Sequence, residues 1–312
     1  MKVFDNKHVQ LHQSNASELP VDDESIDCVV TSPPYWGLRD YGVDEQIGLE
    51  STPEKYVENM VNVFREIKRV LKSSGTVWLN LGDSYIGTGH KGDYTDPKYK
   101  EGRNGQTVAI NNKVAGYKSK DLVGIPWMVA FALRADGWYL RSDIIWNKPN
   151  PMPESVKDRP TKSHEYIFLL TKSPTYYYDA DAIRETLDTP LHKPGNKTAY
   201  GVVMRDDFGT DAMDRVWGNP EGRNKRSVWT VNTHPYPDAH FATFPEKLVE
   251  PCILAGSPLG GTVLDPFVGS GTTLAVAQRL GRNGIGTDIS SEYLKLASKR
   301  LEKVALPMLL NI

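Results

Sequence analysis

The sequence contains few cysteines, no long apolar run and little net charge of either sign. Only two of the 312 residues are cysteines, Cys28 and Cys252, which excludes a disulfide framework and fits a reducing, cytoplasmic location. No apolar run approaches the length of a membrane-spanning helix, and the N-terminus lacks a signal-peptide pattern. We therefore expect a protein without membrane contact.

Neither basic nor acidic residues dominate the chain. The formal net charge is −2, so any contact with nucleic acid has to come from a local patch rather than from the protein as a whole. The seven histidines are scattered and none form a pair at metal-ligand spacing, so we expect no metal site.

A rigid polar turn follows the first strongly apolar run, at 26–31. This turn is Ser32-Pro33-Pro34-Tyr35. The prolines fix φ and cannot donate hydrogen bonds, so carbonyl oxygens in the turn stay available as acceptors. The tyrosine ring offers a flat face for stacking. Acceptors beside a stacking ring suit the exocyclic amino group of a nucleobase, although prolines can also simply end a strand.

A glycine-rich turn follows another predicted strand near the C-terminus. Asp265 stands at the carboxyl end of this strand, and Gly269 and Gly271 allow a ligand to approach the backbone. The helix that begins at Thr272 has free N–H groups that favour a carboxylate. Asp288 ends the next strand, where ribose hydroxyls are bound in nucleotide-binding folds. A carboxylate and a ribose together indicate S-adenosylmethionine (SAM).

Other glycine-rich motifs fit this turn less well. A P-loop requires a lysine after its last glycine, and here Thr272 follows Gly271. A dinucleotide fingerprint requires a third glycine where Leu274 stands. A tight turn without a ligand would not explain why two aspartates stand at strand ends.

The two turns together resemble the motifs of SAM-dependent DNA amino-methyltransferases. Thr-Ser-Pro-Pro-Tyr-Trp lies at 31–36 and Asp-Pro-Phe-Val-Gly-Ser-Gly-Thr-Thr at 265–273, the order of the permuted β class. The resemblance covers nearly the whole chain. It implies methyl transfer to a DNA base that is rotated out of the duplex, by direct displacement and without a covalent enzyme intermediate. Serine in the first catalytic position usually accompanies N4 of cytosine, so N6 of adenine is the alternative. A SAM-binding but inactive nucleic-acid-binding protein is a less favoured one.

The resemblance also assigns residues to roles. It places catalytic residues at Ser32, Pro33, Pro34 and Tyr35, and cofactor-binding residues at Asn15, Ala16, Thr31, Phe241, Thr243, Asp265, Phe267, Gly269, Ser270, Gly271, Thr272, Thr273 and Asp288. Asp265 would hold the methionine ammonium group, Thr272 and Thr273 its carboxylate, and Asp288 the ribose. Asn15 stands where family members usually carry aspartate.

Methylation at carbon 5 of cytosine would need a cysteine nucleophile instead. Cys28 lies inside a predicted strand and Cys252 on the apolar face of a predicted helix. Both are therefore predicted to be small core residues.

The expected fold is a Rossmann-like, doubly wound α/β sheet of the class I SAM-dependent methyltransferase type, with circularly permuted motif order and an inserted target-recognition region. Strands are expected at 26–31, 76–81, 138–146, 165–171, 262–265 and 284–288, and helices at 53–72, 122–136, 244–256, 271–281 and 290–303. Their alternation predicts parallel pairing, with both ligand-binding turns at the carboxyl edge. Residues 1–181 and 240–312 would form the catalytic domain.

Two segments are candidates for contact with double-stranded DNA. A loop at 84–121 is rich in basic residues, and the predicted target-recognition region at 182–239 contains the cluster Arg223-Asn-Lys225-Arg226. Trp36 is a further candidate, as a wall of the base pocket. A solvated charged loop is the alternative for both segments. Two further partners are compatible with the resemblance, a second copy of the chain and a cognate restriction endonuclease.

Overall fold

The computed structural model of the 312-residue chain describes residues 1–38, 42–43, 45–87, 114–186, 222–233 and 244–304. The predicted cofactor contacts Phe241 and Thr243 lie outside these ranges. Most of the basic loop at 84–121 and most of the predicted recognition region at 182–239 do so too.

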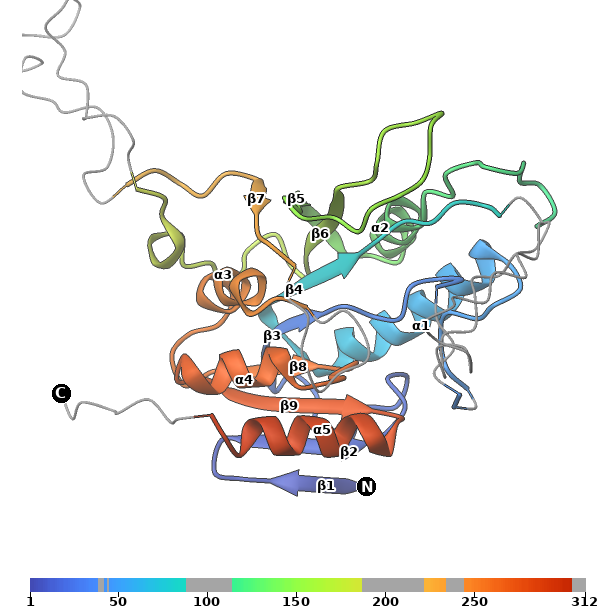
Figure 1. Ribbon diagram of the computed structural model, residues 1–312. Coiled ribbons are helices and arrows are strands. Elements are labelled where there is room, and N and C mark those ends of the chain that lie inside the picture. The colour runs from blue at the N-terminus through green and yellow to red at the C-terminus, as the bar shows by residue number, and fades with distance from the viewer. Residues whose placement is uncertain (39–41, 44, 88–113, 187–221, 234–243, 305–312) are drawn as a thin grey trace, which may run out of the picture.

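The described part of the chain forms one mixed sheet of nine strands, in the order β1-β2-β9-β8-β3-β4-β6-β5-β7. In chain order the strands are β1 (Lys2–Asp5), β2 (Val9–Gln13), β3 (Ile26–Thr31), β4 (Leu71–Leu81), β5 (Tyr139–Asn147), β6 (His164–Thr171), β7 (Val228–Thr230), β8 (Thr262–Asp265) and β9 (Asn283–Asp288). The two N-terminal strands lie beside the C-terminal β9 and α5, so the ends of the described chain meet at one side of the sheet (Figure 1).

Five α-helices and one short 3-10 helix accompany these strands in the described ranges. They are α1 (Pro53–Val70), α2 (Ile125–Ala135), η1 (Asp181–Ile183), α3 (Glu246–Gly256), α4 (Thr272–Arg279) and α5 (Ser291–Leu301). Proline stands in the first turn of α1, and the side chain of Thr52 caps that helix by accepting from the Lys55 N–H. None of these helices is both long enough and apolar enough to cross a membrane.

Helices cover both faces of the sheet because its central strands are apolar on both sides. Val29 of β3 packs in a core with α1 and α2, whereas its neighbours Cys28 and Val30 pack in a second core with α3 and α4. Successive side chains of a strand point to opposite faces, so such strands require cover on both. The predicted doubly wound α/β architecture is confirmed.

The predicted all-parallel pairing is wrong at β6. This strand pairs antiparallel with both β4 and β5, and β1 pairs antiparallel with β2. In the described structure, β5 reaches β6 through residues 148–163 without a helix, whereas parallel neighbours are usually joined by a helical crossover. Because β6 begins at the carboxyl edge, it brings its first residues to the edge where the predicted ligand turns lie.

The sequence analysis missed β1, β2 and β7. Each of these strands has at most five residues, and β1 and β7 are largely exposed, so they lack a continuous apolar run. Predicted elements otherwise match within a few residues, except that β4 begins at Leu71 rather than at residue 76.

Candidate active site

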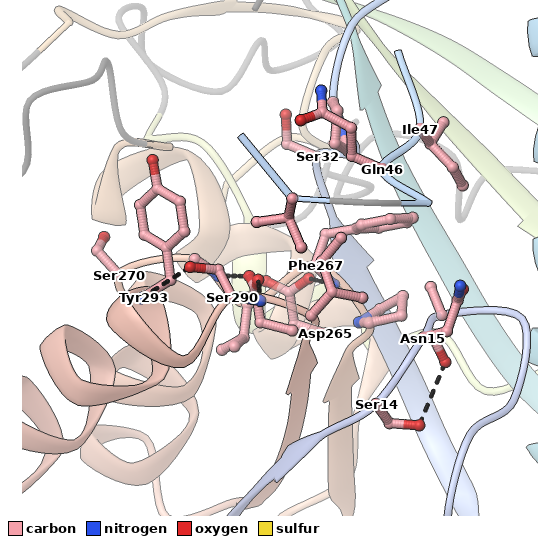
Figure 2. Close-up of a pocket in the computed structure, with 18 of the residues that line it drawn as sticks. Ser14, Asn15, Ser32, Gln46, Ile47, Asp265, Phe267, Ser270, Ser290 and Tyr293 are labelled. Carbon is pink, nitrogen blue, oxygen red and sulfur yellow. Dashed lines mark hydrogen bonds between the residues drawn. The ribbon is translucent and has the colours of Figure 1, made fainter. Parts of the chain in front are cut away.

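A pocket opens at the carboxyl ends of β3, β8 and β9, and both predicted turns line it (Figure 2). Its wall consists of Ser14, Asn15, Ala16, Ser32, Pro34, Val43, Glu45, Gln46, Ile47, Phe244, Asp265, Pro266, Phe267, Val268, Gly269, Ser270, Thr272, Thr273, Asp288, Ile289, Ser290 and Tyr293. The parallel pairing of β3 with β8, and of β8 with β9, brings these distant segments together. Parallel α/β sheets bind ligands at this edge.

Asp265 is the acidic group at the centre of the pocket. Its carboxylate accepts hydrogen bonds from the Thr31 hydroxyl at 2.7 Å and from the Phe267 N–H at 3.1 Å. Burial raises the pKa of Asp265 to about 6, because a carboxylate loses hydration there without gaining a cation in the described structure. A positively charged ligand group would complete this environment.

Asp288 stands at the end of β9 and organises the turn beside it. Its carboxylate accepts from the Gly269 N–H at 3.0 Å and from the Ser290 N–H at 2.9 Å. Burial raises the pKa of Asp288 to about 6 despite these two hydrogen bonds. The glycine-rich turn and the acid of the next strand are therefore one connected unit.

The glycine-rich turn depends on a left-handed residue. Gly271 has φ of 81° and forms the N-cap of α4, and a Cβ there would lie 3.1 Å from the Cβ of Ala297 in α5. Thr272 and Thr273 line the pocket in the first turn of α4. The Thr272 hydroxyl accepts from Arg300 at 2.8 Å, which brings a guanidinium close to the helix N-terminus. The arrangement suits an anionic group, as predicted for the methionine carboxylate.

The catalytic turn contributes Ser32 and Pro34 to the pocket. The carbonyl oxygen of Pro34 accepts from the Tyr56 hydroxyl at 2.9 Å, which fixes the turn to α1. Pro33 is buried and does not line the pocket, so the role predicted for its carbonyl oxygen stays a prediction.

Tyr35 lies behind Ser32 rather than in the pocket wall. Its ring is half-buried against Gly82, where a Cβ would come within 2.6 Å of the ring. Its hydroxyl donates to Glu165 at 2.7 Å and is also in contact with Asn80 and Ser32. Burial raises the pKa of Tyr35 well above its ordinary value, so the phenol keeps its proton.

Three predicted site residues act differently from expectation. Trp36 has 3% of its surface exposed, donates through its indole nitrogen to the Glu50 carbonyl and does not line the pocket, so its predicted contact with the base stays a prediction. Thr31 is fully buried and reaches the pocket only through Asp265. Gly271 shapes the turn without lining the pocket.

Asn15 and Ala16 line the pocket where the resemblance placed them. The Asn15 side-chain oxygen accepts from both the N–H and the hydroxyl of Ser17 at 3.0 Å. An asparagine can thus shape this turn as an aspartate would, because the oxygen acceptor is common to both.

Several pocket residues were missed by sequence reasoning. They are Ser14, Val43, Glu45, Gln46, Ile47, Phe244, Pro266, Val268, Ile289, Ser290 and Tyr293. Ser290 follows Asp288 and caps α5, so its position could have been found from the acid at the strand end. The segment at 45–47 carries no motif, and only the folded chain brings it to the pocket.

Both cysteines are core residues, as predicted. Each is fully buried, and burial raises the pKa of the Cys28 thiol to about 12. Neither lines the pocket, so neither is placed to add to a ring carbon.

The predicted DNA-contacting cluster lies between η1 and β7. Arg223 and Arg226 both donate through Nε to Glu185, at 3.1 and 3.0 Å, and the Lys225 ammonium lies 5.1 Å from the centre of the Trp229 ring. The Arg226 side chain is 67% exposed and the Arg223 side chain 34%. Arg226 is therefore the more accessible of the two arginines.

Comparisons with known proteins place the chain in a family. The profile of the family described as DNA methylase matches residues 26–299. The chain is 50% identical over 278 residues to the type II methyltransferase M.Cfr9I of Citrobacter freundii, covering 89% of this chain and 82% of the relative. It is 48% identical over 282 residues to M.SmaI of Serratia marcescens, covering 90% and 86%.

Two solved structures share the fold. The PvuII DNA methyltransferase, described as cytosine-N4-specific, has a TM-score of 0.63 and 18% identity, covering 94% of this chain and 86% of that one. A putative DNA modification methylase from Thermus thermophilus, complexed with SAM, has a TM-score of 0.59 and 22% identity, covering 96% and 94%. With the family profile and the type II relatives, these matches identify the class of protein. The chain belongs to the DNA methylase family, whose members use SAM to methylate N4 of cytosine or N6 of adenine in DNA.

Proposed function

We propose that the protein methylates the N4 amino group of cytosine in duplex DNA at a specific site. The observation that carries this proposal is the position of Ser32, which lines the same pocket as the predicted cofactor residues Asp265 and Asp288. A hydroxyl at this position can accept a hydrogen bond from an amino group. The cytosine-N4 specificity of the PvuII neighbour favours N4 over N6, which remains the alternative.

The pocket residues fit SAM by their charge and hydrogen-bonding capacity. Asp265 would accept from the methionine ammonium group, the first turn of α4 would hold its carboxylate, and Asp288 would accept from the ribose hydroxyls. The two raised pKa values support this assignment, since each marks a buried acid that a donor or cation would stabilise. When bound, SAM supplies an activated methyl group.

The catalytic turn would then orient the acceptor nitrogen. The target cytosine leaves the stack, because its amino group cannot meet the pocket from inside the duplex. Ser32 accepts a hydrogen bond from that amino group, which aims the nitrogen lone pair at the methyl carbon. Orientation of the two reacting atoms supplies most of the rate, and no enzyme nucleophile takes part.

SAM affinity should fall as the pH falls through about 6. The free protein binds protons on Asp265 and Asp288 below that pH, because burial has raised both pKa values to about 6. A ligand ammonium group favours the ionised carboxylate, so binding at lower pH must release a proton. We expect up to about tenfold weaker binding for each pH unit and each carboxyl below 6, and little change above 7.

Calorimetry between pH 5 and 8 measures this dependence, and buffers of different ionisation enthalpy report the released protons. The Asp265→Asn variant is the matched comparison, and its affinity should depend less steeply on pH. The same affinity for wild type at pH 5 and 7.5 would contradict the assignment.

Neutralising the exposed cations at 225–226 should weaken DNA binding. We expect the Lys225→Gln, Arg226→Gln variant to reduce the slope of log affinity against log salt by about 0.9 for each phosphate that the protein no longer neutralises. Lys299→Gln is the control, because this exposed lysine lies in the last turn of α5 and not in the cluster at 223–226. Fluorescence anisotropy at several salt concentrations checks the result. An unchanged slope would show that residues 225–226 do not contact DNA phosphates.

Mass spectrometry of nucleosides tests the proposed product. Mixed-sequence duplex DNA is incubated with the protein and SAM, then digested to nucleosides. We expect N4-methylcytosine. N6-methyladenine would move the assignment to the alternative, and 5-methylcytosine would overturn the mechanism.

A further inference from the structure

A compact polar cluster lies behind Ser32, and its other members do not line the pocket. It joins Tyr35 of the catalytic turn, Asn80 near the end of β4, Glu165 near the start of β6 and Lys148 just after β5. The antiparallel insertion of β6 between β4 and β5 places Glu165 beside the turn. The sequence motifs assigned no role to Asn80, Lys148 or Glu165.

The Glu165 carboxylate is the shared acceptor of this cluster. Glu165 accepts from the Tyr35 hydroxyl at 2.7 Å and from the Asn80 amide at 2.9 Å, and it forms an ion pair with Lys148. Asn80 also contacts the Tyr35 hydroxyl and donates to Ser32 Oγ at 3.3 Å. Only 15% of the Glu165 side chain and 16% of the Lys148 side chain are exposed, so solvent screens the pair little.

This arrangement sets the direction of the hydrogen bonds. An ionised carboxylate can only accept, so the Tyr35 proton points at Glu165 and the tyrosine oxygen is left as an acceptor. Asn80 faces Ser32 with its NH2 group, which only donates, so this group cannot take the Ser32 proton. Ser32 donates to the Tyr35 oxygen, 3.4 Å away, and accepts from Asn80, so one of its two lone pairs stays available for the target amino group.

We propose that Glu165 is a positioning residue that, through Tyr35 and Asn80, keeps the Ser32 hydroxyl as a hydrogen-bond acceptor toward the target amino group. This inference rests on the proposed function and extends it to residues that do not touch the substrate. It explains why the Tyr35 hydroxyl is held away from the pocket wall. It also gives the Asn80 amide a function at an otherwise apolar strand end.

Replacing Glu165 by glutamine should disturb this polarity without changing the shape of the side chain. The glutamine amide can donate to Tyr35, which lets Tyr35 donate to Ser32 and turns the serine proton toward the target amino group. The Ser32 hydroxyl and the target amino group would then both present hydrogens to each other, and no hydrogen bond would form between them. We expect the single-turnover rate of Glu165→Gln to fall on the order of 10²-fold, with SAM and DNA affinities within about twofold of wild type.

Two variants separate this role from a structural one. Glu165→Asp keeps the charge on a shorter side chain and should recover part of the rate. Glu154→Gln is the matched control, because Glu154 lies at the same edge but binds the Arg159 guanidinium at 2.8 Å and the Lys162 N–H at 3.0 Å rather than the catalytic turn. It should keep the wild-type rate.

A double-mutant cycle with Tyr35→Phe completes the test. The phenylalanine keeps the ring but breaks the link to Glu165, so adding Glu165→Gln to it should cost less than about threefold further. If Glu165→Gln alone does not bind SAM, the same cycle is measured with Glu165→Asp in place of Glu165→Gln. A wild-type rate in Glu165→Gln, or equal losses in both backgrounds, would overturn the inference. Absence of any methylated product from wild type would instead count against the proposed function.

Discussion

Replacing Ser32 by alanine should lower the single-turnover rate of methyl transfer by about 10²- to 10³-fold. A preorganised hydrogen-bonding group that orients a reacting atom contributes about this much to catalysis. SAM affinity should change less than twofold, because Asp265 and Asp288 carry the contacts that we assign to the cofactor. Rapid-quench measurement with labelled SAM and calorimetry of SAM binding together check both expectations.

Ser14→Ala is the control for this experiment. Ser14 also lines the pocket, but its hydroxyl donates to the Glu18 carbonyl at 2.6 Å, far from the catalytic turn in the chain. It should slow the chemical step by no more than a few-fold. Full activity in Ser32→Ala would remove the serine from the mechanism and leave the turn a purely structural feature.

Replacing Asp265 by alanine should weaken SAM binding by about 10- to 100-fold. A hydrogen bond between two charged groups contributes about 1.5–3 kcal/mol, and each 1.36 kcal/mol is a factor of ten. The loss should be larger than for Thr31→Val, because Thr31 only supports the carboxylate through its 2.7 Å hydrogen bond. Equilibrium dialysis with labelled SAM measures both variants.

The stability of Asp265→Ala should move in the opposite direction from its ligand affinity. The ionised, buried carboxylate is unfavourable in the free protein above pH 6, so removing it should not lower the thermal midpoint in the absence of SAM. Stabilisation by added SAM should largely disappear. Unchanged SAM affinity in this variant would show that the cofactor binds elsewhere.

The paired motifs made the fold and about half of the pocket lining predictable from the sequence. Buried strands that end in Thr31, Asp265 and Asp288 leave polar groups at one edge of the sheet. A run rich in apolar residues or glycine that ends in a polar residue is visible in the sequence at each of these strands. Tyr56 and Ile67 mark the apolar face of α1 in the same way. Local pattern and tertiary structure agree at these positions.

The supporting residues could not be predicted, because their roles depend on which strands become neighbours. Glu165 reads as an ordinary polar residue at the start of a strand, and only the antiparallel insertion of β6 brings it to Tyr35. The burial of Trp36 could not be predicted for a related reason. A tryptophan beside a catalytic turn is a reasonable wall for a base, but here its indole fills the core beneath the turn.

Photolabelling tests most directly whether the two turns share one SAM-binding pocket. The protein is irradiated with labelled SAM, with and without excess S-adenosylhomocysteine, and its tryptic peptides are sequenced by mass spectrometry. We predict competable label in the peptides at 8–39, 248–279 or 283–295, which carry Ser32, Phe267 and Tyr293. Competable label confined to peptides that carry none of the pocket residues would contradict the shared pocket and the assignments that depend on it.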